Sequence, residues 1–323
     1  MEKLSDNSIR NGLYNSFLET ANSPFYITTE DLIRLGAWVM ASENLNYNHS
    51  RGNAVLDSQY LAFFSLKLPY EYEKDIYRQT KISTTEIINF IKLLEKRISQ
   101  RLPLPYITNE AWYLGWRFYV NEHTLVPRSI MNHKFNEFLQ DMKWSNYKVL
   151  DLCAGSGCIG ISLALLDSRI RVDLVDMSSD ALEVAKVNIE SYFVIKDRVN
   201  AIQSDLFTNV DGKYDLIITN PPYLPTEEYN FQSAEYKAEP KIALEAGEKG
   251  LDLVKRILND SWKYMNQDGV LIVEVGPTSQ DFCKQDYPDM PFEWVVTGRE
   301  PDFQGRSGVF RLKYGYQDYW KVA

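Results

Sequence analysis

The segment Val149-Leu-Asp-Leu-Cys-Ala-Gly-Ser-Gly-Cys-Ile-Gly160 joins an apolar strand to a helix through a glycine-rich turn, a connection typical of α/β folds. Gly155, Gly157 and Gly160 suit a backbone that turns sharply with positive φ and lets a ligand come close. The free N–H groups at the start of the helix favour a carboxylate or a phosphate. Asp176 follows Gly157 by 19 residues, at the place of the acid that binds ribose hydroxyls in nucleotide-binding folds. The segment therefore predicts a ligand site at this turn.

Strands and helices alternate along the second half of the chain, which predicts βαβ units and a parallel sheet with helices on both faces. The expected strands are Tyr147–Leu152, Val172–Val175, Tyr214–Thr219 and Val270–Val275, and the expected helices are Cys158–Leu166, Ser179–Tyr192 and Leu251–Met265. The last two strands, Phe292–Thr297 and Gly308–Leu312, follow each other without a helix between them. An antiparallel pair at the edge of the sheet is expected for them.

Residues 1–101 are expected to be helical, with Thr28 or Thr29 capping one helix and a capping box at Ser83–Glu86 starting another. Two prolines after Arg101 end this region. An aromatic stretch, residues 111–120, is interrupted by Gly115 and predicts a hairpin. The domain organisation expected from this is a helical substrate-recognition domain at 1–103, a hairpin linker at 104–128 and a catalytic domain at 129–323.

The charge of the chain lies in its second half. Of its 323 residues, 1–140 carry 15 basic and 15 acidic side chains, and 141–323 carry 20 and 29, which accounts for the whole net charge of −9. No basic cluster of the kind that grips duplex DNA is present, and the acidic half suits a basic partner or simply solubility. Three cysteines and the lack of an apolar run of about 18 residues predict a reduced, cytoplasmic protein without a membrane span.

Asn220-Pro-Pro-Tyr223 ends the expected strand Tyr214–Thr219, at the sheet edge where open α/β folds bind ligands. A planar NH₂ group is a poor nucleophile, and methylating it requires orientation and stabilisation of the positive charge that develops on nitrogen. The Asn220 side-chain oxygen and the Pro221 carbonyl can accept both N–H groups, and Tyr223 can stack on the planar group. Positioning and fixed dipoles would supply most of the rate, and no strong base is needed.

These motifs together resemble class I methyltransferases that act on planar NH₂ nitrogens. The segment Glu239-Pro240 to Leu251-Asp252 resembles E-P-x-x-A-L-x-x-G-x-x-G-L-D of the protein-glutamine methyltransferases related to HemK. Leu125–Ser129, Tyr106–Trp112 and Tyr287–Phe292 are similar to its PrmB branch. The resemblance implies a Rossmann-like, mostly parallel seven-stranded sheet with a helical N-terminal domain. It also implies methyl transfer from S-adenosylmethionine to the N5 amide of a glutamine in ribosomal protein L-three of the large subunit.

The site residues follow from the turn, the strand ends and the resemblance. The expected catalytic residues are Asn220, Pro221, Pro222 and Tyr223, and the expected cofactor-binding residues are Asp151, Cys153, Ala154, Gly155, Ser156, Gly157, Asp176, Asp205, Leu206 and Asn220. Asp205 and Leu206 lie in the segment 204–207, which follows a further strand expected between Val175 and Ser204 and which lies where adenine would lie. Asp151 is expected either to fix the glycine turn or to contact the amino group of the cofactor. No metal site is expected.

Two segments depart from the family pattern. After Ser129 the family continues with a proline and a short glutamate-containing helix, whereas this chain runs Ile130-Met-Asn-His-Lys134 and is several residues short. The loop 298–308 is longer than expected. The three histidines, His49, His123 and His133, are interpreted as structural or surface residues. Arg128 and Glu274 are candidates for the pocket, with an ion pair and a solvent-exposed strand end as the respective alternatives.

Three other functions remain open at this level. The same chemistry could act on a release-factor glutamine, whose site residues would be identical, or on the exocyclic amine of adenine, for which a basic groove and a base-extracting domain are missing. A non-catalytic assembly module that binds a ribosomal protein is the third. The oligomeric state and the identity of the glutamine are not predicted.

Overall fold

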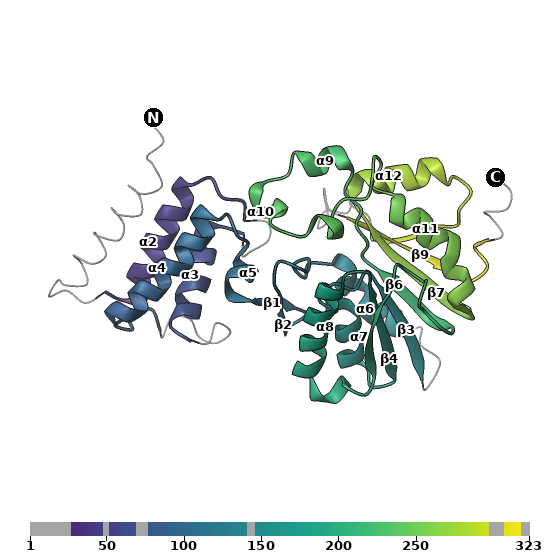
Figure 1. Cartoon of the computed structure of the whole chain (residues 1–323), viewed down its shortest axis with the longest axis horizontal. Helices are drawn as coiled ribbons and strands as arrows, with labels where there is room; N and C mark the ends of the chain where they lie inside the picture. The colour runs from purple at the N-terminus through teal and green to yellow at the C-terminus, as the bar shows by residue number, and fades with distance from the viewer. Residues whose placement is uncertain (1–26, 48–51, 69–76, 141–145, 297–306, 318–323) are drawn as a thin grey trace. The chain divides into compact units, whose positions relative to one another are not determined.

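The computed structural model describes residues 27–47, 52–68, 77–140, 146–296 and 307–317 (Figure 1). The chain divides into two compact units. The first, which we call the helical unit, comprises residues 1–109 together with 233–238, and the second, the sheet unit, comprises 110–232 and 239–323. Every helix within the described ranges is too short or too polar to cross a membrane.

The helical unit is built from α2 (Thr29–Ser42), α3 (Ala54–Ser65), α4 (Thr84–Ser99), α5 (Leu104–Thr108) and the short α10 (Ala234–Lys237). Thr28 caps α2 through a capping box with Asp31, and Ser83 caps α4 through a capping box with Glu86, so the second predicted helix start is confirmed. The apolar faces of these helices form one core, to which Leu32, Leu61 and Phe90 contribute fully buried side chains. Each such residue stabilises the fold by about 1.5–3 kcal/mol.

The sheet unit contains a seven-stranded sheet in the order β5-β4-β3-β6-β7-β9-β8. Its strands are β3 (Tyr147–Leu152), β4 (Ile170–Asp176), β5 (Val199–Gln203), β6 (Tyr214–Thr219), β7 (Met265–Val275), β8 (Glu293–Val296) and β9 (Gly308–Lys313). The first five are parallel, and β9 is antiparallel to both of its neighbours, β7 and β8. The mostly parallel Rossmann-like sheet and the antiparallel pair at its edge are thus confirmed.

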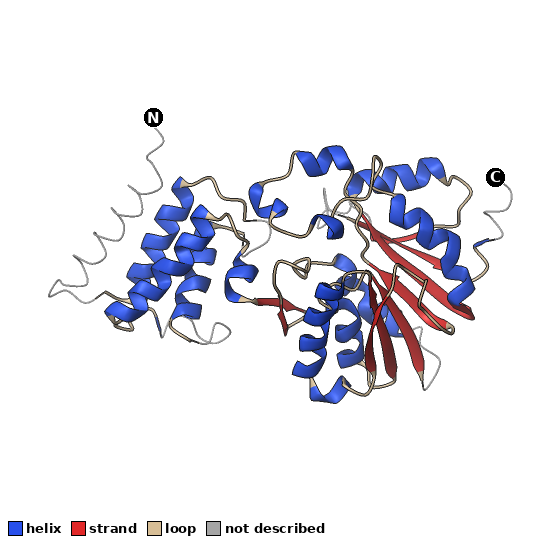
Figure 2. Ribbon diagram, viewed as in Figure 1, coloured by secondary structure: helices blue, strands red, loops and turns tan. Residues whose placement is uncertain are grey.

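Helices cover both faces of this sheet, as Figure 2 shows. The helices are α6 (Phe135–Gln140), α7 (Cys158–Leu166), α8 (Ser179–Ser191), α9 (Thr226–Asn230), α11 (Asp252–Asp260) and α12 (Pro277–Asp286), with 3₁₀ turns at Ile130–Lys134, Phe193–Ile195, Lys241–Ala243 and Ser261–Tyr264. Neighbouring strand residues enter opposite cores: Val149 and Ile218 pack with α7 and α8, whereas Leu150 and Ile217 pack with α11. Because both faces are buried there, the central strands β3 and β6 are mostly apolar without a regular alternation.

The hairpin predicted within residues 111–120 is formed by β1 (Glu110–Tyr113) and β2 (Trp116–Tyr119). Residues 104–108, expected as the beginning of the hairpin linker, instead form α5 and belong to the helical unit. Pro103 precedes this helix and Pro105 lies in its first turn, where a missing N–H is tolerated, so the prolines start a second helix as well as ending α4. The expected helix 251–265 ends at Asp260 and continues as a 3₁₀ turn.

Candidate active site

The glycine-rich turn joins the carboxyl end of β3 to the first residue of α7. Gly155 has a φ of +55° and Gly157, the N-cap of α7, has a φ of +77°, conformations that other residues rarely adopt. A Cβ on Gly155 would meet no atom within 4 Å, whereas one on Gly157 would lie 2.8 Å from Leu174 Cδ1. The first glycine leaves space for a ligand against the backbone, and the second allows α7 to begin close to the sheet.

Two carboxylates at the ends of neighbouring strands hold this turn. Asp151 Oδ2 accepts a hydrogen bond from Gly160 N at 2.8 Å, and its Oδ1 is buried with no partner among the described residues. Asp176 accepts hydrogen bonds from the backbone N–H groups of Gly155 and Ser178, both at 2.9 Å. Burial raises the pKa of Asp151 to about 7 and also raises the pKa of Asp176. Asp151 therefore fixes the turn, as one of its two predicted roles required, and keeps one acceptor oxygen available.

Asn220 directly follows β6 at the same edge of the sheet. Thr219, the last residue of β6, donates its hydroxyl to the carbonyl of Leu152 at 2.8 Å and so fixes the end of β6 to β3. The Asn220 Oδ1 atom is buried and has no hydrogen-bond partner within the described part of the chain. An unsatisfied buried acceptor costs about 1–3 kcal/mol. Such an atom at a sheet edge is typical of a site that receives its donor from a ligand.

A pocket that is partly open to solvent lies at the carboxyl ends of β3, β4 and β6. All of its lining residues belong to the sheet unit. They are His123–Ser129, Cys153–Ser156, Cys158, Ile159, Asp176–Ser178, Ala181, Asn220, Pro222, Ile242, Ala243 and Leu253. The glycine turn and the Asn220 corner therefore line one pocket, as the strand-end positions predicted.

Comparison with known proteins places the chain in a family. Residues 134–236 match the methyltransferase small domain. The ribosomal protein uL3 glutamine methyltransferase of Francisella tularensis subsp. tularensis is 37% identical over 303 residues, covering 91% of this chain and 94% of the relative. The protein of the same description from Neisseria meningitidis serogroup B is 35% identical over 275 residues, covering 84% and 89%. The chain belongs to the uL3 glutamine methyltransferases.

This membership confirms the resemblance seen in the motifs and identifies the protein as a methyltransferase. Among solved structures, a methyltransferase from Pyrococcus furiosus is 15% identical, with a TM-score of 0.44, and covers 62% of this chain and 90% of that one. The two motifs that the sequence indicated, the glycine turn and the Asn220 corner, are neighbours in space because both line one pocket.

Tyr223 of this methyltransferase is held on several sides and lies outside the pocket lining. Its carbonyl accepts a hydrogen bond from Ser279 Oγ at 2.8 Å, and a Cβ on Gly250 would come within 2.1 Å of the same oxygen. Its hydroxyl is 2.9 Å from Ser307 Oγ and donates to Glu274 at 3.5 Å. Stacking of this ring on a substrate remains a prediction, whereas the observed contacts fix the position of the corner that begins with Asn220.

One wall of the pocket, residues 123–129, is attached to the sheet unit by two buried glutamates. Glu239 accepts hydrogen bonds from Val126 N at 2.9 Å and from both terminal nitrogens of Arg128 at 2.6 and 2.8 Å. Glu274 accepts hydrogen bonds from Ser129 Oγ at 2.6 Å and from a backbone N–H beyond it. Burial raises the pKa of Glu274 to about 7, against the lowering effect of these hydrogen bonds. Both expectations for Arg128, pocket lining and an ion pair, are met.

The structure separates the predicted site residues into three groups. Cys153, Ala154, Gly155, Ser156, Asp176, Asn220 and Pro222 line the pocket. Asp151, in β3, and Gly157, Pro221 and Tyr223, in the turns, lie beside the pocket without lining it. Asp205 and Leu206 do neither. Asp205 is half exposed and forms an ion pair with Arg256 at 2.8 Å, and Leu206 is buried in the sheet core. The adenine contact of Asp205 stays a prediction, and in this structure its carboxylate is paired with Arg256 outside the pocket lining.

Several residues of the pocket were not expected. His123 lines it, although the histidines were interpreted as structural or surface residues, and Met177, half exposed, lines it beside Asp176. Glu239 begins the segment that resembles the HemK-related family, and its ion pair with Arg128 joins residues that are 111 positions apart in the sequence, which no local pattern predicts. Burial raises the pKa of Cys158 to about 12, so this thiol stays protonated. Among the described residues, no group of three or more His, Cys, Asp or Glu could hold a metal.

The two departures from the family pattern have different outcomes. Residues Ile130–Lys134 form a 3₁₀ turn that Ser129 caps, and Glu137 in the helix that follows is exposed. In this chain the carboxylate facing Ser129 comes from Glu274 on β7. The alternative for Glu274, a strand end in solvent, is wrong, since its side chain is buried. Most of the loop 298–308, like His49, lies outside the described residues.

Proposed function

We propose that this protein transfers a methyl group from S-adenosylmethionine to the side-chain amide nitrogen of a glutamine in ribosomal protein uL3, in the cytoplasm during ribosome assembly. The observation that carries the proposal is the buried, unpartnered Asn220 oxygen in a pocket lined by the glycine turn. The names of the relatives support the choice of uL3. The net charge of −9 in residues 141–323 suits a basic ribosomal protein.

The pocket residues fit S-adenosylmethionine. Asp176 lines the pocket at the end of β4, where it can accept hydrogen bonds from ribose hydroxyls. Gly155 leaves open space over the turn, and the buried Oδ1 of Asp151 is an acceptor still to be satisfied. Cys153, Ala154 and Ser156 complete this side of the pocket. The bound cofactor supplies an electrophilic methyl group on a sulfonium.

The substrate amide is activated by orientation rather than by a base. Asn220 Oδ1 accepts one N–H of the glutamine amide, and the Pro221 carbonyl accepts the other, so the lone pair of the nitrogen is aimed out of the amide plane. As the bond between the nitrogen and the methyl carbon forms, the bond between that carbon and the cofactor sulfur breaks and S-adenosylhomocysteine is the leaving group. Positive charge develops on the nitrogen, and the two oxygen dipoles stabilise it without reorganising. The nitrogen then becomes acidic and loses one proton to solvent, which restores a neutral secondary amide.

Two purified substrates test the proposal and separate it from its main alternative. The protein is incubated with S-adenosylmethionine and either uL3 or a peptide chain release factor, and incorporation is followed by intact-mass spectrometry. We expect uL3 to be methylated at least about tenfold faster, a difference of about 1.4 kcal/mol in transition-state binding. Preference for the release factor would overturn the choice of substrate, and no transfer to either protein would favour the non-catalytic module.

The timing is tested with the same assay. Free uL3 and assembled large subunits are compared as substrates at equal concentration. Methylation of free uL3 and none of the assembled subunit is the expected result, whereas preferential methylation of the subunit would place the reaction after assembly.

A further inference from the structure

The loop after the Asn220 corner leaves the sheet unit and returns to it. Its two ends are joined: Leu224 N donates to Leu244 O at 2.8 Å, Ala246 N donates to Leu224 O at 3.0 Å, and Thr226 N donates to Gly247 O at 2.9 Å. Between these ends, residues 233–238 belong to the helical unit. The same loop therefore starts beside Asn220, passes through the helical unit and returns through Ile242 and Ala243, which line the pocket.

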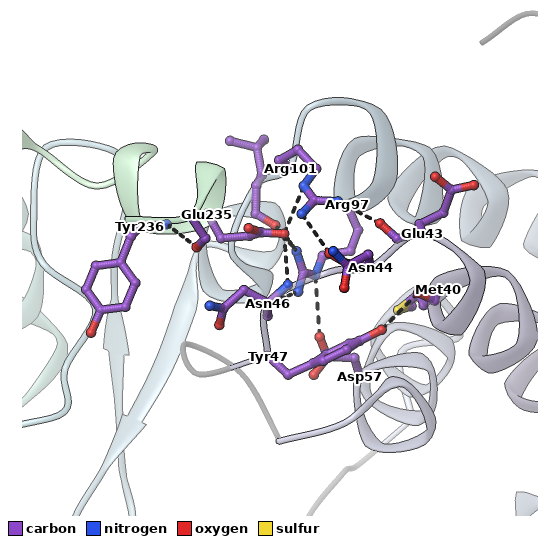
Figure 3. A network of polar contacts seen from close by, with 12 residues as sticks. Met40, Glu43, Asn44, Asn46, Tyr47, Asp57, Arg97, Arg101, Glu235 and Tyr236 are labelled. Carbon is purple, nitrogen blue, oxygen red and sulfur yellow. Dashed lines mark hydrogen bonds and ion pairs between the residues drawn. The ribbon is translucent and has the colours of Figure 1, made fainter. Parts of the chain in front are cut away.

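Glu235 is the attachment point of this loop within the helical unit (Figure 3). Its side chain is 1% exposed, and its Oε1 atom accepts a hydrogen bond from Asn46 N at 3.1 Å. The same oxygen lies 3.0 Å from Arg101 Nε and 3.5 Å from a terminal nitrogen of Arg97. Its Oε2 atom is buried with no hydrogen-bond partner in the described part of the chain. Burial alone would raise the pKa of Glu235, but the backbone hydrogen bonds and the two arginines lower it overall.

The two arginines are satisfied by the helical bundle without this glutamate. Arg97 Nε contacts Asp57 at 3.4 Å, and its other nitrogens donate to backbone carbonyls at 2.6 and 3.3 Å. Arg101 donates to the carbonyls of Glu43 and Asn44 at 2.9 and 3.0 Å. Asp57 supplies one negative charge beside these two arginines and Glu235 supplies the second, but neither arginine depends on Glu235 for a hydrogen-bond acceptor. Glu235 also fixes the position of residues 233–238 within the helical unit.

We propose that Glu235 is a positioning residue for methyl transfer, which couples the helical unit to the loop between Asn220 and the pocket residues Ile242 and Ala243. This inference rests on the proposed function. A whole protein substrate that engages the helical unit depends on this coupling, whereas a short fragment that occupies only the pocket does not. Cofactor binding is independent of it, since the glycine turn and Asp176 belong to the sheet unit.

The test compares E235A with wild type in three measurements. These are kcat/KM on full-length uL3, kcat/KM on a short uL3 fragment around the glutamine that wild type modifies, and the Kd of S-adenosylhomocysteine by calorimetry. We expect kcat/KM on full-length uL3 to fall by about tenfold or more, and the other two quantities to stay within about threefold. The reason is that only full-length uL3 engages the helical unit, whereas the fragment and the cofactor product bind in the pocket alone.

Matched variants separate positioning from folding. R101Q removes the same ion pair from the other side, in a side chain that is 30% exposed, and should reproduce the pattern of E235A even if E235A folds poorly. E235Q keeps an acceptor for Asn46 N but loses the negative charge. Its kcat/KM on full-length uL3 should therefore lie between the values of wild type and E235A. E30Q breaks another glutamate–arginine pair of the helical unit, with Arg78, that does not involve the loop, and should behave as wild type.

The outcomes are distinct. Unchanged kcat/KM on full-length uL3 in both E235A and R101Q overturns the inference, and so does an equal loss on uL3 and on the fragment, which would show a general effect on the pocket. If wild type methylates only a release factor, the proposed substrate is wrong. The same comparison, made with that factor and its fragment, then still decides the role of Glu235.

Discussion

At the scale of single residues, Asn220 carries the proposed chemistry because its side-chain oxygen is buried and lacks a donor in the described structure. Replacing it with alanine removes the acceptor that orients the substrate amide. We expect N220A to lower kcat by about 10²–10³-fold, as the loss of a transition-state hydrogen-bonding group does in other enzymes. The Kd of S-adenosylhomocysteine should stay within about threefold. Steady-state kinetics and calorimetry measure the two quantities.

Asn132 offers a matched control for that variant. Its Oδ1 atom is also buried without a partner among the described residues, but it does not line the pocket. N132A should therefore keep the wild-type kcat. Equal losses in N220A and N132A would show that the effect is structural, and full activity of N220A would remove Asn220 from the mechanism.

Asp176 and Asp205 test the cofactor side of the pocket. Asp176 lines the pocket and accepts the N–H of Gly155, whereas Asp205 is paired with Arg256 outside the lining. D176A should raise the Kd of S-adenosylhomocysteine about 10–100-fold, the size expected for losing hydrogen bonds to a charged group. D205A should change it by less than about twofold. A larger effect of D205A would restore the adenine contact expected from the sequence.

At the scale of elements, β7 contributes to the site through Glu274, which joins the pocket wall at Ser129 to the Tyr223 hydroxyl. Its pKa is raised from 4.5 to about 7, so the folded state holds more protons than the unfolded state between these values. The free energy of unfolding should therefore fall as the pH rises from 5 to 8, by an amount on the order of 3 kcal/mol at most.

The neutral variant E274Q lacks this contribution at every pH. Relative to E274Q, the wild type should be less stable at pH 8 than at pH 5, as measured by denaturant unfolding at the two pH values. E137Q, in which an exposed carboxylate is replaced, should show the same pH dependence of the free energy of unfolding as the wild type. Parallel pH dependences of wild type and E274Q would show that Glu274 is not the group that titrates.

The elements of the sheet could be predicted where their sequences are apolar. Tyr147–Leu152 and Tyr214–Thr219 are buried on both faces, and their predicted bounds are confirmed. The strand Val199–Gln203 is short and contains Asn200 and Gln203, so no apolar run defines its bounds. The first half of Met265–Val275 is polar and was not predicted for the same reason. Contacts across the fold, such as Tyr223 with Ser307, could not be predicted because no local pattern determines them.

At the scale of the whole molecule, the excess acidic charge lies in residues 141–323. Long-range attraction to a basic ribosomal protein is screened as salt rises, with a Debye length of about 10 Å at 0.1 M. We expect kcat/KM on uL3 to fall several-fold between about 50 and 200 mM salt, while the Kd of S-adenosylhomocysteine changes little. A salt-independent kcat/KM would exclude charge attraction as a source of substrate capture.

The division of the chain into units shows the limit of sequence reasoning. A helical N-terminal region and an α/β region were evident from composition and periodicity. The membership of residues 233–238 in the helical unit was not, because only the tertiary contacts of Glu235 with Arg97 and Arg101 reveal it. Domain boundaries placed at prolines and hairpins divide the chain into continuous segments. Residues 233–238 belong to the helical unit although the sheet unit flanks them in sequence, and no local pattern in the sequence indicates this.

Tandem mass spectrometry of uL3 after incubation with S-adenosylmethionine and either wild type or N220A examines the proposed chemistry directly. With wild type we predict one added methyl group, on a glutamine side chain, and with N220A almost none at equal enzyme and time. A methyl group on a lysine or arginine, or equal modification by the two enzymes, would show that the Asn220 oxygen does not present an amide nitrogen for transfer.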